Sequence, residues 1–306
     1  MVESSMERKV IQLAGKTFVV SLPSKWAKKY GIKKGDTLFL EEKEKSIIVR
    51  TSKAVDVEKV QLSLEGPYEF IKRNIDVAYK KGIDELRLDF EDPKIKKVIS
   101  NVLESTMGFE IISQGEKSCT IKSVATAVEG EFDNILRRVF LTLLSMAEES
   151  YDAVSKSQLS RLNEIAFADS TINKLTNFCK RILNKKGYKN CRQTSYIYCI
   201  VWELERIGDE YRRICREISG QKKKISRDVL DLYKETNTML RNFYNLFYKF
   251  DQKKGLEFTN KKEFLMKKAR QLIPKKSGAD SVLLHHLAGI ITSVYDIAGP
   301  YYAMAL

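Results

Sequence analysis

The stretch ELERIGDEY, residues Glu203 to Tyr211, lies inside a long helical pattern and decides how the second half of the chain is interpreted. At 100° per residue, the apolar side chains around it fall on one stripe, which predicts a helix with one buried face. The stripe consists of Ile197, Ile200, Val201, Leu204, Ile207, Tyr211, Ile214 and Ile218. Glu205 and Asp209 are four residues apart, so they lie together on the flank of that helix, beside Tyr198 and Trp202.

Two like charges at this spacing repel each other by roughly 0.2–0.5 kcal/mol on an isolated helix, so a positive charge should compensate them. Arg212 and Arg213 follow on the same helix and are the simplest source of that charge. A bound cation is the alternative, because carboxylates suit iron, magnesium, manganese or calcium, whereas zinc usually takes His or Cys. The spacing alone leaves three interpretations open: a metal site, an acid–base pair and a solvated helix face.

From about residue 127 to the end, the sequence predicts helices and no strands. The helices are expected at about 129–155, 158–185, 192–219, 226–252, 259–273 and 279–306, with polar turns between them. A shift of about ninety residues places the ELERIGDEY helix on the last helix, with Ile200 on Ile290 and Tyr211 on Tyr301. This internal repeat predicts an up-and-down bundle of two three-helix halves.

The second half of the repeat lacks the carboxylate pair. Tyr295 and Gly299 stand where the first half has its two acidic residues, and Asp296 lies one residue out of register. Pro300 is expected to kink or end the helical hydrogen bonding at this place. At most one of two equivalent sites is therefore predicted to be intact.

Residues 54–126 alternate between strand and helix patterns. The strand patterns KVQLSL and DELRLDF are separated by a helical pattern that starts after Pro67 and ends at Gly82. A second helical pattern lies between Pro93 and Gly108, and FEIIS and CTIKSV close the segment as strands. This order predicts a small α/β domain.

Residues 1–53 predict two hairpins with a short helix between them. KVIQL and FVVSL flank the turn AGK, and TLFLEE and SIIVR flank KEK. Ser24 is a candidate cap for a helix from Lys25 to Tyr30, which Gly31 would end. So short a segment cannot bury a core alone, but two copies that exchange hairpins can. The expected domains are thus 1–53, 54–126 and 127–306.

Composition narrows the class of protein. The 306 residues are 43% hydrophobic and 31% charged, with a formal net charge of +14, which suggests two or three domains and an anionic partner. The five cysteines form no CxxC pair, which argues against a disulfide framework or a zinc site and favours a reducing cytoplasm.

The apolar C-terminal stretch is the one candidate for a membrane span. It carries Asp296, Pro300 and both histidines, so a helix buried in a bundle is expected and a span is not. His285 and His286 point about 100° apart on a helix and are expected to serve packing or an interface.

The segment RKVIQLAGKTFVVSLPSKWAKKYGIKKGDTLFL resembles the AbrB/SpoVT/MazE-like swapped-hairpin domain over roughly residues 7–51. The resemblance implies a homodimeric β-barrel of interleaved hairpins that often binds DNA, although some members only dimerise or bind a protein toxin. Basic residues of the first strand and its loop make the DNA contacts in related domains. The matching positions here are Arg8, Lys9 and Lys16, together with Lys25 and Lys28.

ELERIGDEYRRI, on the third helix of a repeated three-helix unit, resembles the signature of the PhoU family, and ADSTINKL resembles its second-helix pattern. The resemblance implies a bundle of two three-helix repeats whose E/DxxxD motifs bind multinuclear metal clusters. Carried over residue by residue, it assigns Glu205 and Asp209 to a site for a divalent or ferric ion, with Asp169 as a further ligand. The combined segments resemble the archaeal PhoU-like regulators.

These resemblances imply a homodimeric, DNA-binding regulator of phosphate uptake. The cysteine usage predicts that it is cytoplasmic, and the lack of a Ser/His/Asp or Cys/His arrangement predicts that it is not an enzyme. The alternative is a PhoU-type interaction protein that does not bind DNA and acts on a phosphate transporter or its signalling kinase. A metal-dependent phosphatase is disfavoured, because the ligand set lacks histidine and half of the symmetric site is missing.

Overall fold

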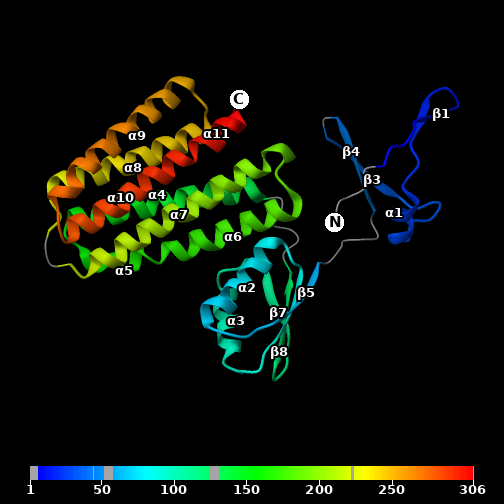
Figure 1. Cartoon of the computed structure of the whole chain (residues 1–306), viewed down its shortest axis with the longest axis horizontal. Helices are drawn as coiled ribbons and strands as arrows, with labels where there is room; N and C mark the ends of the chain where they lie inside the picture. Colours follow the sequence, from blue (N-terminus) through cyan, green and yellow to red (C-terminus); the bar gives the residue numbers. More distant parts are fainter. Residues whose placement is uncertain (1–5, 44, 52–57, 125–130, 222–223, 306) are drawn as a thin grey trace. The chain divides into compact units, whose positions relative to one another are not determined.

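The protein is described by a computed structural model that covers residues 6–43, 45–51, 58–124, 131–221 and 224–305. The chain divides into two compact units, Met1–Glu58 and Lys59–Leu306 (Figure 1). The segments expected to form a separate α/β domain and a separate bundle thus share the second unit.

Unit 1 consists of two separate antiparallel hairpins, β1–β2 and β3–β4, with one helix between them. The first hairpin turns at Ala14 and Gly15, both of which have positive φ angles. The helix begins at Ser24 itself, and Pro23 precedes it without a capping side-chain hydrogen bond, so the expected Ser24 cap is wrong. The elements are β1 (Ile11–Leu13), β2 (Thr17–Val19), α1 (Ser24–Lys29), β3 (Leu38–Lys43) and β4 (Ser46–Thr51).

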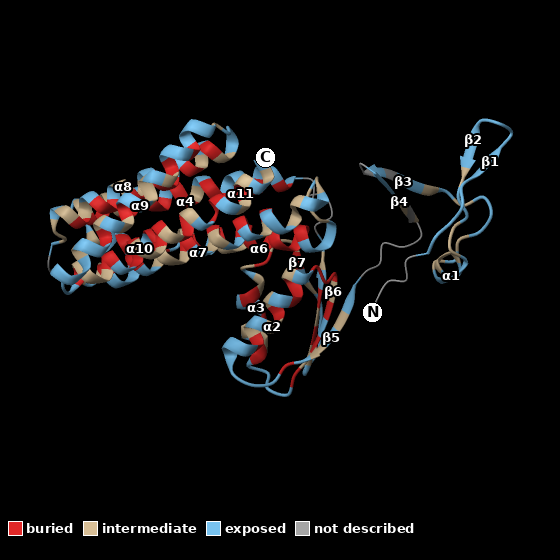
Figure 2. Ribbon diagram, turned by 45° about the horizontal axis from the view of Figure 1, so that its top comes forward, coloured by how far each residue is buried: buried red, intermediate tan, exposed pale blue. Residues whose placement is uncertain are grey.

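None of the described side chains of unit 1 is buried (Figure 2). Its strands nevertheless carry large apolar side chains, including Phe18, Leu40 and Ile47, which are 70%, 69% and 67% exposed. Within the described residues, a single copy of unit 1 therefore has no hydrophobic core of its own.

The second unit begins with a four-stranded sheet in the order β5-β6-β8-β7. Strands β5 and β6 are parallel, and the other neighbours are antiparallel. Leu86 and Leu88 of β6 are fully buried while Arg87 between them is exposed, because helices cover one face of the sheet (Figure 1). The elements are β5 (Lys59–Ser63), α2 (Tyr68–Lys81), β6 (Glu85–Asp89), α3 (Ile95–Leu103), β7 (Phe109–Gln114) and β8 (Ser118–Ser123).

The helices that follow form the bundle of two three-helix halves that the internal repeat predicts. Its second helix is broken into α5 and α6, and its last helix into α10 and α11. The bundle comprises α4 (Phe132–Ser155), α5 (Leu162–Ile165), α6 (Ala168–Lys186), α7 (Thr194–Ser219), α8 (Arg227–Tyr248), α9 (Gln252–Leu272), α10 (Ala279–Asp296) and α11 (Ala298–Ala305).

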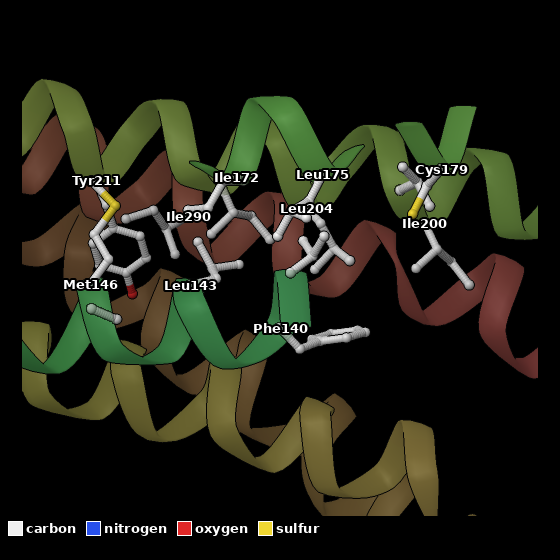
Figure 3. Packing of buried hydrophobic residues seen from close by; sticks show 14 of the residues in the cluster. Phe140, Leu143, Met146, Ile172, Leu175, Cys179, Ile200, Leu204, Tyr211 and Ile290 are labelled. Atoms are coloured by element: carbon white, nitrogen blue, oxygen red, sulfur yellow. The ribbon is translucent and has the colours of Figure 1, made fainter. Parts of the chain in front are cut away.

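The predicted apolar stripe of α7 is the centre of the bundle core. All eight of its side chains are buried, and they meet residues such as Phe140 and Leu143 of α4, Ile172 of α6 and Ile290 of α10 (Figure 3). Ile290 and Tyr301, which the repeat aligns with the stripe, are buried as well. The stripe of α7 thus packs against the equivalent helix of the other half.

The last helix of the bundle is interrupted between α10 and α11. Helix α10 ends at Asp296, four residues before Pro300. A proline ring clashes with the carbonyl group four residues before it, which here belongs to Asp296. Ala279–Ala305 is long and apolar enough to cross a membrane, the only such stretch among the described residues. However, 56% of the most apolar 18-residue segment of this stretch is buried inside the bundle.

Helix α9 begins seven residues before its expected start. The side chain of Asp251 accepts a hydrogen bond from the Lys254 amide at 2.9 Å, which caps the helix and draws the sequence QKKG into its first turn. Gly255 is tolerated inside the helix because Tyr302 lies against it, so close that a Cβ atom would stand 3.0 Å from the Tyr302 hydroxyl.

The sheet layer is joined to the bundle through α2 and α6. Arg181 of α6 is 3% exposed and donates hydrogen bonds to the carbonyl oxygens of Tyr79 at 3.0 Å and Ile83 at 2.7 Å. It also pairs with Asp84 at 3.0 Å, and Lys185 pairs with the same carboxylate. This guanidinium therefore occupies the C-terminal end of α2, where carbonyl groups lack helical partners.

Candidate functional site

The candidate site lies where α6 passes α7. Glu205 and Asp209 project from the middle of α7, and Asp169 projects from the first turn of α6. Gly208, between the two α7 acids, allows close approach, since a Cβ atom there would stand 3.2 Å from Ile172 and 3.6 Å from Asp169 Oδ1. The structure thus brings Asp169 close to the segment of α7 that carries Glu205 and Asp209.

Glu205 is neutralised by a lysine from the neighbouring helix. Lys180 of α6 forms an ion pair with Glu205 Oε2, and its side chain is only 2% exposed. The Thr176 hydroxyl lies 3.2 Å from the same oxygen, and the Lys180 ammonium lies 4.5 Å from the centre of the Trp202 ring. Burial lowers the pKa of Lys180, and the charge of Glu205 opposes that change.

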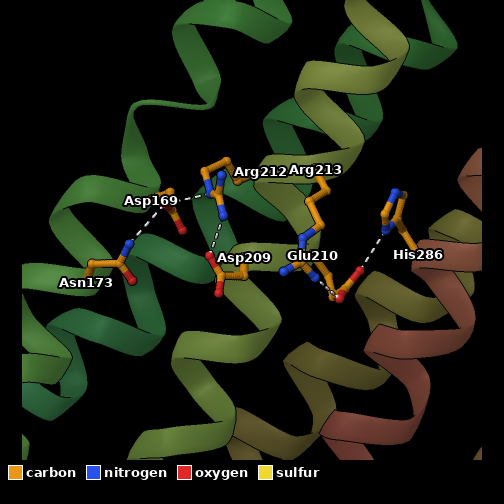
Figure 4. Close-up of polar contacts among 7 residues, drawn as sticks. All are labelled: Asp169, Asn173, Asp209, Glu210, Arg212, Arg213 and His286. Atoms are coloured by element: carbon orange, nitrogen blue, oxygen red, sulfur yellow. Dashed lines mark hydrogen bonds and ion pairs between the residues drawn. The ribbon is translucent and has the colours of Figure 1, made fainter. Parts of the chain in front are cut away.

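Asp209 and Asp169 share one arginine (Figure 4). Arg212 Nη2 contacts Asp209 Oδ1 at 2.7 Å, and Arg212 Nε lies 2.9 Å from Asp169 Oδ2. Asn173 donates a hydrogen bond to Asp169 Oδ2 at 3.0 Å. Arg212 was one of the two expected sources of compensating charge, and the structure confirms it.

Asp169 is the most perturbed acid of the group. Its burial raises the pKa of its carboxyl group to about 6; Arg212 opposes that rise, and the charges of Asp209 and Glu205 add to it. Its Oδ1 atom is buried without a hydrogen-bond partner. A neutral Asp169 is therefore accessible near neutral pH.

A second polar group lies on the next face of α7 (Figure 4). His286 of α10 is 4% exposed, with Nδ1 2.6 Å from Glu210 Oε2 and Nε2 3.3 Å from Glu217 Oε1. Arg213, the other expected compensating residue, pairs with Glu210 and not with the candidate site. His286 thus ties α10 to α7, as expected for an interface residue.

As arranged, the candidate site does not fit a metal ion. Each of its three carboxylates already contacts a positive side chain of the protein, and Asp169 Oδ1 is their one oxygen that is buried without a hydrogen-bond partner. Across the part of the chain that the structure describes, no group of three His, Cys, Asp or Glu side chains is placed to hold a metal.

The five basic residues assigned to DNA contact are all exposed. Arg8 and Lys9 precede β1, whereas Lys16 lies in the turn between β1 and β2. Lys25 and Lys28 are on α1. Only Lys16 therefore lies in the loop of the first hairpin, and none of the five is within a strand.

Sequence reasoning missed Lys180, Thr176 and Asn173. The sequence indicates only that these residues share one face of α6 with Asp169. The spacings between Asp169, Asn173, Thr176 and Lys180 are three or four residues, as expected for neighbours on one helix face. Nothing in the sequence, however, pairs that face with Glu205 across two helices.

Comparison with known proteins divides the chain in the same way. Residues 11–56 match the family of antidote-toxin recognition MazE, a bacterial antitoxin, and residues 136–218 match the PhoU domain. The first match spans the hairpins of unit 1, and the second spans the first three-helix half of the bundle. No curated protein matches the sequence.

Among solved structures, the phosphate transport system regulatory protein PhoU from Streptococcus pneumoniae is similar, with 17% identity and a TM-score of 0.46. The similarity covers 56% of this chain and 92% of that protein. This likeness is too distant to add to the assignment.

Proposed function

We propose that the protein is a DNA-binding transcriptional regulator of phosphate uptake, with no catalytic role. The observation that carries the proposal is the presence, in one chain, of a MazE-like hairpin unit and a PhoU domain. The first supplies a module compatible with DNA binding. The second supplies a module of phosphate regulation, through which the protein would contact a phosphate transporter or a signalling protein.

The exposed apolar strands of unit 1 support a homodimer. Side chains such as Phe18, Leu40 and Ile47 would each gain about 1.5–3 kcal/mol from full burial, which a single copy does not provide. A second copy that interleaves its hairpins is the simplest cover, since both copies present the same apolar strands.

A dimer also doubles the basic surface. Residues 1–58 contain twelve Lys or Arg and eight Asp or Glu residues, so the net charge of one copy is modest. Two copies bring two sets of Arg8, Lys9, Lys16, Lys25 and Lys28 to one assembly, a number of cations suited to the phosphates of a duplex.

The test is binding of the full-length protein to DNA upstream of phosphate-uptake genes, measured by fluorescence anisotropy across a salt series. Affinity should fall with salt, with a logarithmic slope of about 0.9 for each phosphate contacted. The triple variant Arg8→Glu, Lys9→Glu, Lys16→Glu should bind far more weakly and show a shallower slope.

The matched control carries the same change of charge on the sheet layer: Lys81→Glu, Lys94→Glu, Lys97→Glu, all at exposed positions. It should retain most of the affinity. Equal losses in the two variants, or no DNA binding at low salt by the wild type, would reject the DNA-binding role and favour an interaction protein that acts on a transporter or kinase.

A further inference from the structure

We propose that Lys180 and Arg212 are the counter-ions of the signature carboxylates Glu205, Asp209 and Asp169, so that this bundle uses two of its own side chains where a metal ion would otherwise sit. The inference is independent of DNA binding and rests on the contacts between α6 and α7.

The ammonium group of Lys180 occupies the place beside Glu205 that a metal ion would take. A buried ammonium group is unfavourable unless it is paired, and this one has Glu205 as its ion-pair partner and the face of Trp202 beside it. Its side chain is 2% exposed, far less than that of Glu205 at 25%. The lysine therefore fills the interior side of the carboxylate and leaves solvent on the outer side.

Arg212 is the positive partner of the other two acids, Asp209 and Asp169. Its guanidinium group contacts Asp209 and Asp169 with different nitrogen atoms, which is a bridging role that a divalent ion often fills. A metal ion between these carboxylates would lie next to both Lys180 and Arg212, and like charges at such short range repel strongly when partly buried.

The degenerate half of the bundle shows a related arrangement. Tyr295 stands at the position equivalent to Glu205, and Lys262 of α9 lies 4.2 Å from the centre of its ring. Helix α9 is the second helix of its half, as α6 is of the first. In both halves, then, a lysine of the second helix reaches the signature position of the third helix, once through an ion pair and once through an aromatic ring.

The experiment begins with the metal content of the full-length wild-type protein, purified without chelator, by elemental analysis. We expect no stoichiometric metal, and a melting temperature that neither EDTA nor Mn²⁺ changes. Stoichiometric metal that is lost in Glu205→Gln would overturn the proposal directly, and this measurement does not depend on the folding of any lysine variant.

The second arm compares Lys180→Met with Lys189→Met, a control that removes an ion pair with Asp133 in which the lysine side chain is 73% exposed. Lys180→Met should lower the melting temperature by about 5–10 °C, and added Mn²⁺ should restore part of the loss. The control should change little and should not respond to Mn²⁺. Equal melting temperatures for the two variants would show that Lys180 is not a counter-ion the site needs.

Discussion

Replacement of Arg181 by methionine should loosen the sheet layer from the bundle. Methionine keeps much of the side-chain length but removes every donor, so the carbonyl oxygens of Tyr79 and Ile83 lose their hydrogen bonds. Asp84 loses one of its cationic partners and keeps Lys185. The Phe109 ring of β7, whose centre lies 5.0 Å from the guanidinium carbon, also loses its cationic neighbour.

The magnitude follows from burial. Breaking a buried charged pair typically costs about 3–5 kcal/mol, because the remaining groups stay desolvated. Arg181 is 3% exposed, but Lys185 still compensates Asp84, so we expect the lower end, about 3 kcal/mol. Lys185→Met is the matched control: it removes a partner that is 27% exposed and should cost about 1 kcal/mol or less.

The assay is urea denaturation of the full-length protein followed by helical circular dichroism, together with amide hydrogen exchange. In Arg181→Met, the amides of α2 and β6 should exchange faster, while those of α8, far from the joint, should keep their protection. A loss no larger than that of Lys185→Met, or uniform loss of protection across α2 and α8, would refute the interpretation of Arg181 as the anchor.

Three further outcomes are expected. The pKa of Asp169 is raised from 3.8 to about 6 in the folded state, so ionisation of this carboxyl group disfavours folding as the pH rises. Between pH 5 and pH 7, the free energy of unfolding of the wild type, measured by urea titration, should fall by about 1 kcal/mol more than that of Asp169→Asn. Phe140→Ala should cost about 3–5 kcal/mol by the same measurement, since the ring is fully buried against Phe243 and Phe247. Phe18→Asp should shift the protein from dimer to monomer in sedimentation experiments, because its 70% exposed ring would lie in the proposed interface.

Periodicity predicted the bundle core well, because burial of one helix face leaves a regular trace in the sequence. The stripe of α7 and the break four residues before Pro300 both follow from local chemistry. The start of α9 did not, since KKG resembles a turn and only the cap by Asp251 and the contact with Tyr302 make it helical. Tertiary contacts there override a weak local preference.

The candidate site was predictable only within its own helix. Arg212 lies three residues beyond Asp209, so helical geometry alone pairs them. Lys180 reaches Glu205 from another helix, 25 residues earlier in the chain, and no single-helix rule identifies such a partner. The metal site therefore stays a prediction from resemblance, whereas the paired cations come from the packing of α6 on α7.

The anchor at Arg181 decides where the chain can be cut. A fragment made only of α4 to α11 would leave that guanidinium without its carbonyl acceptors and would expose the face of α6 that α2 now covers. The sheet layer on its own would lose the cation that closes the end of α2. Recombinant pieces for crystallography or binding assays should therefore separate at the boundary between Glu58 and Lys59 and keep the sheet with the helices.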